Sequence, residues 1–580
     1  MSNRLDADQK TILNLFSDRK ANFLIPDYQR PYAWTTTECQ ILWDDIFAFA
    51  FPNDDYSQFK SDSDEYYLGP IVTFSNENNI KEVIDGQQRL TTLMLLLRAF
   101  HTKYGKMKDS NSVKTKETIE KCIWRTDEFG NPDKNALKID SEVATDNDKS
   151  EFLNILKTGE IPKKPSSKYA ENYVFFQQQI NIFLDSYPSF FSYLPARILN
   201  NCYLLSIEAD SQDSALRIFS TLNDRGLPLS DSDIFKAQFY KHYSDQREKD
   251  DFINKWKDLE AQCNSIFHPS AGSPMDELFT RYMYFERAKQ GIKGSTTDAL
   301  RKFYEKNSYR LLKENQTFDN LIALADFWND VENQNTDRFT NKILRKLSVL
   351  KYAPNNMWTY FTSVYFMQNK AADGFLEDEA FYKFLCKTIG FIWTYAITNP
   401  GVNALRTPIY PEMINIVNDR PITFTPFDAT RVRNTFSNFD FNNNRPITKS
   451  MLAWWAYHND EQQLIPFDTI LQIEHIFSRG RQEKERKLRN LKNLESLGNK
   501  SLLERRINIR ASDYRFEDKQ KYYLGFKTQN NNEKQGTMIA ELISLAKNKI
   551  DFTEVDIEER ESLIINEFLS YLKQNQLLSD

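Results

Sequence analysis

The stretch Val83-Ile84-Asp85-Gly86-Gln87-Gln88-Arg89 runs from an apolar, strand-like segment directly into a helix. The helix is predicted from Leu90 to Phe100, because Leu90, Leu93, Met94 and Leu97 recur at 3.6-residue spacing and share one face. Gly86 stands at the turn between strand and helix. This junction predicts that the N-terminal part of the chain mixes strands and helices.

Apolar runs on both sides extend this part from residue 1 to residue 245. They predict strands over 67–74, 81–84 and 203–207, and helices over 214–222 and 231–243. Two polar stretches, 104–118 and 140–170, are poor in large apolar residues and are interpreted as surface loops. The pattern as a whole predicts a mixed α/β domain over 1–245.

The strand-to-helix turn is a candidate phosphate site. A helix N-terminus offers unpaired N–H groups and the positive end of a dipole, Gly86 permits close approach, and Arg89 can grip oxygens through two bonds. Asp85 could hold Mg²⁺ or orient a water molecule. The alternative interpretation, in which Asp85 caps the helix and Arg89 is a surface charge, remains open from these residues alone.

Two further segments accompany the turn. Ile25 to Trp34 combines two prolines, three aromatic residues and Arg30 in ten residues, a density that indicates a rigid functional loop. Asn223-Asp224-Arg225-Gly226 is a predicted turn, and Ser230 with Asp233 forms a capping box for the next helix. We interpret Asp231 and Asp233 as capping residues, and Asn223, Arg225 and Lys236 as ligand contacts.

The rest of the chain divides into two predicted parts. Residues 246–445 carry long amphipathic segments and form a predicted helical middle domain, which ends at a hinge marked by Asn442-Asn443-Asn444. Residues 446–580 carry the second set of motifs. The fold class that we expect is therefore α+β and multidomain.

The sharpest chemical signal is Glu474-His475, at the end of the apolar run that starts at Ile470. At a strand end the two side chains can straddle one small space, with Glu474 holding a divalent ion and His475 facing an attacking water. A neutral histidine can take a proton from water near neutral pH. These are the two roles that a phosphodiester hydrolase needs.

Residues downstream make the interpretation specific. A turn Gly498-Asn499-x-x-Leu-Leu is followed by Asn508 at the head of a helix and then by Lys519. This series resembles the ββα-metal finger of HNH endonucleases. The resemblance implies that Glu474 and Asn508 bind the metal, that His475 is the general base, and that Asn499 fixes the connecting loop; an oxygen-rich ligand set implies Mg²⁺ or Mn²⁺. Many relatives have a proline soon after the histidine, where this chain has Phe477-Ser478-Arg479.

A local charge cluster supports contact with nucleic acid. Residues 479–521 contain 14 Lys or Arg and 7 Asp or Glu, a local net charge of +7 in a chain of net charge −6. The alternative is a solvated helix face, in which Glu483–Lys487 and Glu485–Arg489 are i,i+4 pairs. The candidate DNA-binding residues are Arg479, Arg481, Arg505, Arg506 and Lys519.

Composition sets the broad class. The chain has 580 residues and a mean hydropathy of −0.62, with no apolar run long enough to cross a bilayer and a polar N-terminus. Its five cysteines lie far apart without a C-x-x-C pair, so neither a disulfide framework nor a thiolate zinc site is suggested. We expect a cytoplasmic protein without membrane contact.

The N-terminal motifs also carry a resemblance. The Asp85–Arg89 motif, the loop before it and the block from Ile218 to Asp233 resemble the DGQQR-motif N-terminal domain of GmrSD-type restriction enzymes, which is related to ParB and sulfiredoxin folds. The resemblance implies binding and hydrolysis of a nucleoside triphosphate, GTP or another. The residues that it implies are Gln29, Arg30, Asp85, Gly86, Gln87, Gln88, Arg89, Asn223, Arg225 and Lys236.

The two signatures together predict a modification-dependent endonuclease that restricts phage DNA, in which nucleotide binding controls metal-dependent cleavage. The rival hypothesis is a nucleotide-dependent DNA-binding sensor or switch whose HNH finger does not cut. The sequence is compatible with a homo-oligomer and does not determine the oligomeric state. The modification, the nucleotide and the kind of cut are equally open at this point.

Overall fold

The computed structural model describes residues 6–143, 146, 148–161, 165, 167–212, 214–215, 218, 230–294, 297, 299–399, 401, 404–527, 531 and 533–579. The chain divides into two compact units, residues 1–258 and 259–580, which are described separately below. No helix in the described part is both long and apolar enough to cross a membrane. The predicted boundary near residue 445 lies inside the second unit, so the three-part division stays a prediction.

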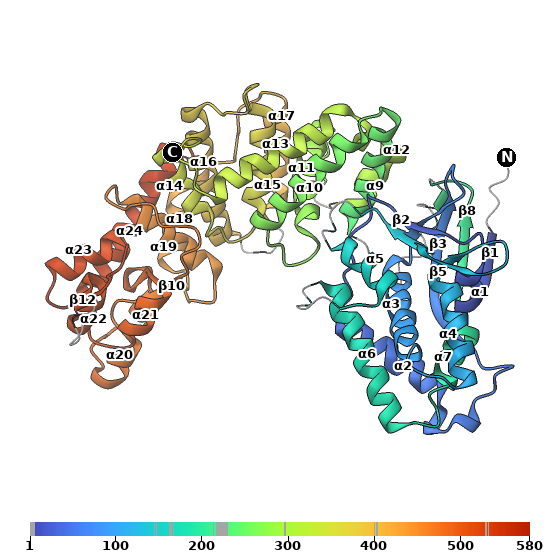
Figure 1. Cartoon of the computed structure of the whole chain (residues 1–580). Coiled ribbons are helices and arrows are strands. Elements are labelled where there is room, and N and C mark those ends of the chain that lie inside the picture. The colour runs from blue at the N-terminus through green and yellow to red at the C-terminus, as the bar shows by residue number, and fades with distance from the viewer. Residues whose placement is uncertain are drawn as a thin grey trace. The chain divides into compact units, whose positions relative to one another are not determined.

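The first unit is built on a mixed six-stranded sheet with the order β1-β8-β3-β4-β2-β7 (Figure 1). Its elements are β1 (Asp6–Thr11), α1 (Ile12–Ser17), β2 (Phe23–Ile25), α2 (Thr36–Ala50), β3 (Tyr66–Ser75), β4 (Lys81–Asp85), α3 (Gln87–Tyr104), α4 (Ser110–Ile123), β5 (Trp124–Thr126), β6 (Pro132–Leu137), β7 (Ile139–Ser141), α5 (Lys149–Thr158), α6 (Lys168–Ser186), α7 (Tyr193–Asn201), β8 (Cys202–Ala209), α9 (Asp231–Asp245) and the start of α10 (Lys249–Ile266). β3 pairs in parallel with β8 and antiparallel with β4.

Helix α3 forms the centre of this unit. Leu90, Leu93 and Met94 are fully buried, and so are Leu95 and Leu97, so the helix is enclosed on all sides rather than on the one face that its spacing indicated. Helices α4 and α6 pack against it. A helix this deeply buried fixes the position of its own N-terminus, which follows β4 through Gly86.

The predicted strands and helices agree with β3, β4, α3, β8 and α9 in place and type. The predicted loops are wrong in part, because 104–118 contains most of α4 and 140–170 contains α5. Both helices are polar on one side and bury only a few apolar residues, such as Ile119, Phe152 and Ile155. The helix predicted over 214–222 lies largely outside the described residues.

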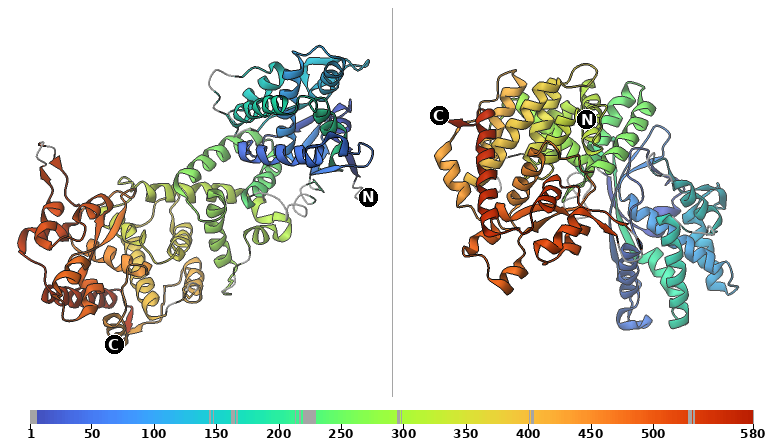
Figure 2. Two further views of the ribbon diagram at one scale, coloured as in Figure 1. Left: turned by 90° about the horizontal axis from the view of Figure 1, so that it is seen from below. Right: turned by 90° about the vertical axis from the view of Figure 1, so that its left-hand side faces the viewer.

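The second unit begins with helices and ends with the small elements around Glu474. Its elements are α11 (Pro274–Lys289), α12 (Leu300–Tyr309), α13 (Asn315–Glu332), α14 (Asn341–Leu350), α15 (Met357–Asn369), α16 (Asp378–Thr398), α17 (Arg406–Val417), β9 (Phe427–Asp428), α18 (Ala429–Ser437), α19 (Pro446–His458), β10 (Leu471–His475), α20 (Arg479–Glu485), β11 (Lys500–Glu504), α21 (Arg505–Ala511), α22 (Phe516–Leu524), β12 (Phe526–Lys527), β13 (Glu533–Lys534), α23 (Ala540–Asn548), α24 (Glu554–Gln574) and β14 (Leu578–Ser579). Among the described residues of 274–417 the ordered elements are all helical (Figure 2).

The hairpin of β10 and β11 carries the candidate nuclease residues. The two strands pair antiparallel over five residues each, with His475 opposite Lys500. Helix α21 follows β11 directly and packs against both strands, and α22 packs against α21. This order of strand, strand and helix is the one that the ββα resemblance predicts.

Candidate functional site

Glu474 lies on the face of β10 that α21 and α22 cover. Its side chain is buried, and Oε1 accepts hydrogen bonds from the Lys519 ammonium and the Tyr523 hydroxyl, each at 2.6 Å. Burial raises the pKa of Glu474, and the positive charge of Lys519 opposes that shift. The carboxylate is therefore held in one place by two donors from α22.

Asn508 faces the same side of β10. Its amide Nδ2 donates to Oε1 of Gln472 at 3.1 Å. Gln472 and Glu474 are two residues apart on a strand, so their side chains leave the strand on the same side. The two predicted metal ligands, Glu474 and Asn508, thus share one face of the hairpin.

The His475 side chain leaves β10 on the side opposite to Glu474 and has different neighbours. His475 is the last residue of the strand, so a phosphate contacted by both groups would lie at the strand end. Its Nε2 is 3.4 Å from Oε1 of Glu495 without making a well-directed hydrogen bond, and its side chain is 11% exposed. Burial, together with the nearby positive charges of Lys500 and Arg479, lowers the pKa of His475 to about 4, and Glu495 opposes the shift. The imidazole is therefore neutral at neutral pH, as a general base requires.

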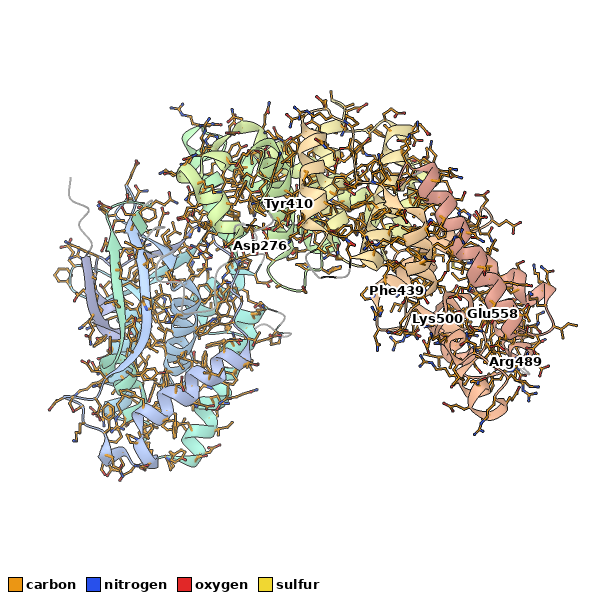
Figure 3. All side chains as sticks on the ribbon, turned by 180° about the vertical axis from the view of Figure 1, so that it is seen from behind. Asp276, Tyr410, Phe439, Arg489, Lys500 and Glu558 are labelled. Carbon is orange, nitrogen blue, oxygen red and sulfur yellow. The ribbon has the colours of Figure 1, made fainter. Side chains whose placement is uncertain are left out.

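A network of charged groups surrounds the imidazole. Glu495 accepts from the Arg479 guanidinium at 2.5 Å and from the buried Lys500 ammonium at 2.5 Å, and Lys500 also donates to the carbonyl of Phe441. Lys500 is labelled in Figure 3. The two cations thus hold the Glu495 carboxylate in place beside the His475 ring. Glu495 lies outside the motifs that the sequence distinguishes, and Lys500 occupies a variable position of the Gly-Asn-x-x-Leu-Leu turn.

Asn499 makes the loop-fixing contacts expected of it. Its Oδ1 accepts from the N–H of Phe477 at 2.7 Å, and its Nδ2 donates to the carbonyls of Phe477 and Leu494 at 3.0 Å each. The residue is fully buried. These bonds join the segment after His475 to the segment before β11, so they hold the end of β10 in place.

The N-terminal candidate site starts at Gly86. Gly86 has a φ of 88° and caps α3, and a Cβ atom there would lie 3.1 Å from the carbonyl oxygen of Pro70. Only glycine fits both the left-handed backbone and this close approach. The N–H of Gly86 donates to Oδ1 of Asp85 at 2.7 Å.

Two arginines lie near Asp85. Burial raises the pKa of Asp85, and the positive charges of Arg89 and Arg30 oppose the shift. Arg89 donates to the carbonyl of Pro70 at 2.7 Å, whereas the buried Nε of Arg30 has no hydrogen-bond partner among the described residues. A buried guanidinium N–H without an acceptor marks a place where an anionic group would be stabilised.

Helix α9 brings Lys236 to the same neighbourhood. Ser230 and Asp233 form the predicted capping box at its start. Burial raises the pKa of Asp233, and its hydrogen bond from Ser230 and the charges of Arg30 and Lys236 oppose that shift. Arg30 and Lys236 are thus both close to Asp233, whereas Asn223 and Arg225 lie outside the described residues.

Comparison with protein-family models gives two matches. Residues 12–240 match the N-terminal domain of the GmrSD restriction endonuclease family, and residues 428–567 match its C-terminal domain. The chain belongs to the GmrSD restriction endonuclease family. The matched parts contain both candidate sites, and family membership supports a role in the restriction of DNA. A comparison with curated proteins found no match.

Two of the predicted DNA contacts of this GmrSD-family chain lie away from the surface. Lys519 is fully buried beside Glu474, and the side chain of Arg481 is 9% exposed and makes two bonds to Asp551 and one to Glu485. Both cations are paired with carboxylates in this structure, so their contact with DNA stays a prediction. The exposed arginines Arg479, Arg505 and Arg506 remain candidates.

The three predicted glutamines of the GmrSD N-terminal domain bind backbone groups of the loop that carries Arg30 and of the strand before Gly86. Gln29 donates to the carbonyls of Val83 and Ile84, and Gln87 donates to the carbonyl of Arg30. Gln88 accepts from the N–H of Ala33 and donates to the carbonyl of Pro31. Because their amides bind backbone, these glutamines position Arg30 beside Asp85.

The donor types of the C-terminal site fit a hard divalent cation. Oε2 of Glu474 and Oδ1 of Asn508 accept no hydrogen bond from the described residues, and carboxylate and amide oxygens are the ligands that Mg²⁺ and Mn²⁺ prefer. No group of three or more His, Cys, Asp or Glu side chains is arranged for a metal in the part of the chain that is described. A cation here would need water and phosphate oxygens to complete its shell.

Proposed function

We propose that the chain is a nucleotide-regulated, metal-dependent DNA endonuclease that restricts modified phage DNA. The observation that carries the proposal is the position of His475 at the end of β10, next in sequence to Glu474, with Asn499 fixing the loop that follows it. A strand end held by this buried amide gives a base a defined direction.

In the proposed reaction, His475 accepts a proton from the attacking water at the ring nitrogen that does not face Glu495. Oε1 of Glu495 lies 3.4 Å from the other nitrogen, Nε2, so its negative charge favours the tautomer that carries hydrogen there and leaves Nδ1 as the base nitrogen. Glu474 and Asn508 would hold Mg²⁺ or Mn²⁺, which would supply charge stabilisation at the phosphate. As the water oxygen bonds to phosphorus, the bond from phosphorus to the leaving oxygen breaks, and a proton from solvent neutralises that oxygen while His475 keeps the proton taken from the attacking water.

The N-terminal site supports control by a nucleotide. Arg30 carries a buried N–H without an acceptor, Gly86 lets a ligand approach the start of α3, and Arg89 and Lys236 add positive charge. A triphosphate matches this set of donors. In this proposal nucleotide binding at the first unit controls cleavage by the second.

One observation favours the rival, a DNA-binding sensor that does not cut. Glu474 is already paired with the Lys519 ammonium, and no group of three or more His, Cys, Asp or Glu side chains among the described residues is arranged for a metal. A panel of plasmids with and without base modifications, each incubated with Mn²⁺ and with each nucleoside triphosphate, separates the two functions. Nicking of some modified plasmid supports the endonuclease, and intact plasmid under every condition supports the sensor.

A second experiment tests the nucleotide site. Arg30→Gln removes the charge but keeps a similar length, so we expect nucleotide hydrolysis to fall by at least tenfold while the unfolding temperature changes little. The matched control is Arg19→Gln, an exposed arginine of the same unit. Unchanged hydrolysis in Arg30→Gln would show that the buried guanidinium does not contact the nucleotide.

A further inference from the structure

A groove of about 1460 Å³ runs beside α21 in the second unit. Helix α21 forms one wall, and the segments 468–470 and 533–538 form the other walls. The groove adjoins the start of β10, at the opposite end of the strand from His475. It is therefore distinct from the faces that hold the Glu474 and His475 side chains.

Arginines from α21 give the groove its positive charge. Arg505 and Arg506 are exposed, and their guanidinium groups bind no acceptor among the described residues. Arg510 makes only long contacts, to the carbonyls of Arg506 at 3.2 Å and Gln535 at 3.4 Å. These three cations differ from Arg481, Lys500 and Lys519 of the same basic segment, which carboxylates neutralise.

The acidic residues of the groove are fewer. Glu504 accepts from the Thr537 hydroxyl and from the N–H of Met538, each at 2.6 Å, so both its oxygens are engaged. Asp468 and Glu533 also line the groove, and Lys534 adds a fourth cation. The wall formed by α21 is thus the cationic one.

Apolar side chains lie exposed between these charges. Ile470, Ile509 and Met538 are 60%, 67% and 41% exposed, and all three line the groove. Guanidinium groups bind phosphates, and aliphatic side chains pack on sugars or insert at base steps in a minor groove. The combination fits the sugar–phosphate backbone of DNA better than it fits a free anion.

We propose that this groove binds the duplex DNA substrate away from the cleaved phosphate, with Arg505, Arg506 and Arg510 on the phosphates and Ile509 on the sugars. Helix α21 then has two roles, because Asn508 on its other side faces Gln472 and the metal-ligand face. The inference rests on the proposed function for the identity of the partner. The inference assigns DNA binding to helix α21 rather than to helix α20.

The test measures binding without cleavage, in full-length protein carrying His475→Ala. Affinity for a short labelled DNA duplex is measured between about 50 and 200 mM salt. Each phosphate contact contributes about 0.9 to the slope of log affinity against log salt, so Arg505→Ala/Arg506→Ala/Arg510→Ala should lower the slope by about 2 to 3. Arg506→Ala alone should lower it by about 1.

The control is Lys484→Ala/Lys487→Ala/Arg489→Ala, which removes three exposed charges from the same basic segment but outside the groove. We expect this control to keep the parent slope. Equal slopes for both triple variants, or a preference of the groove for single-stranded RNA over the duplex, would overturn the inference. A third outcome separates the two proposals. If the groove arginines are needed for DNA binding but the wild-type protein never nicks DNA, the endonuclease proposal alone is contradicted.

Discussion

Single residues decide whether the candidate nuclease site is in place, and Asn499 is the clearest case. Its amide makes three hydrogen bonds that join both ends of the loop between β10 and β11. Asn499→Ala leaves buried backbone groups without hydrogen-bond partners, and a buried polar group left unpaired costs about 1 to 3 kcal/mol. We expect a loss of that order in the free energy of unfolding of the second unit, together with loss of nicking. Asn548→Ala, at an exposed position, should change neither.

His101 gives the first unit a defined response to acid. Arg98 can only donate, so Nδ1 of His101 accepts from it at 2.7 Å, and Nε2 therefore carries the hydrogen that Glu120 accepts at 3.0 Å. Burial lowers the pKa of His101 to about 4; Arg98 and Lys116 lower it as well, whereas Glu120 opposes them. The ammonium of Lys134 lies 3.2 Å from Oε1 of Glu120, the oxygen that accepts from His101.

The sign of the pH effect follows from this neutral ring. Between pH 6.5 and about 4 the unfolded chain binds a proton at His101 that the folded chain does not, so stability falls as the pH falls through this range. The expected loss is on the order of 3 kcal/mol. Chemical unfolding followed at several pH values should show a shallower fall for His101→Gln than for wild type; identical curves would contradict the assignment.

Helix α24 holds the candidate nuclease hairpin through Arg560. One guanidinium nitrogen, Nη1, donates to the carbonyls of Leu497, Gly498 and Lys500, and the other two pair with the carboxylate of Glu541. A Cβ atom at Gly498 would collide with the carbonyl of Ile557, so the hairpin loop and α24 meet at a backbone contact. The helix and the loop around Asn499 therefore behave as one element.

Removing this contact should destabilise the second unit strongly. Arg560→Met leaves the half-buried Glu541 carboxylate without its cation and three backbone carbonyls without a donor, and breaking a fully buried pair costs about 3 to 5 kcal/mol, so we expect a loss of about 2 to 3 kcal/mol here. Thermal unfolding is the measurement, with Arg433→Met on α18 as the control, because Arg433 is exposed and makes one bond to Asn566. A melting temperature in Arg560→Met as high as in the control would contradict the structural role of α24.

The sequence predicted elements where apolar spacing is strong and missed them where it is weak. The strands around Gly86 and the β10 run were predicted because consecutive apolar residues fill them, whereas α4 and α5 carry too few large apolar residues to be distinguished from loops. The same limit applies to the site. Lysine is rarely buried, so the sequence favoured a surface role for Lys519, and its pairing with Glu474 depends on how α22 folds back on β10.

One further residue of the candidate site, Tyr523, could have been predicted from the sequence. Tyr523 follows Lys519 by four residues on a helix, so the two share a face, and both reach Glu474. Glu495 and Lys500 could not have been predicted as neighbours of His475, because their positions depend on the path of the loop between the two strands. The sequence motifs thus located the candidate site, whereas the fold determines which of its charged side chains are paired with an opposite charge.

At the scale of the whole molecule, the two compact units carry one candidate site each, and the family matches assign both to GmrSD restriction endonucleases. The central claim is that His475 is the base of a metal-dependent nuclease. Its most direct test is the nicking of supercoiled plasmid with Mn²⁺ by wild type, His475→Ala and His458→Ala, where His458 is a more exposed histidine of the same unit. The account predicts nicking by wild type and His458→Ala, abolished by a chelator, and a rate at least about 100-fold lower for His475→Ala. Equal nicking by all three proteins would contradict it.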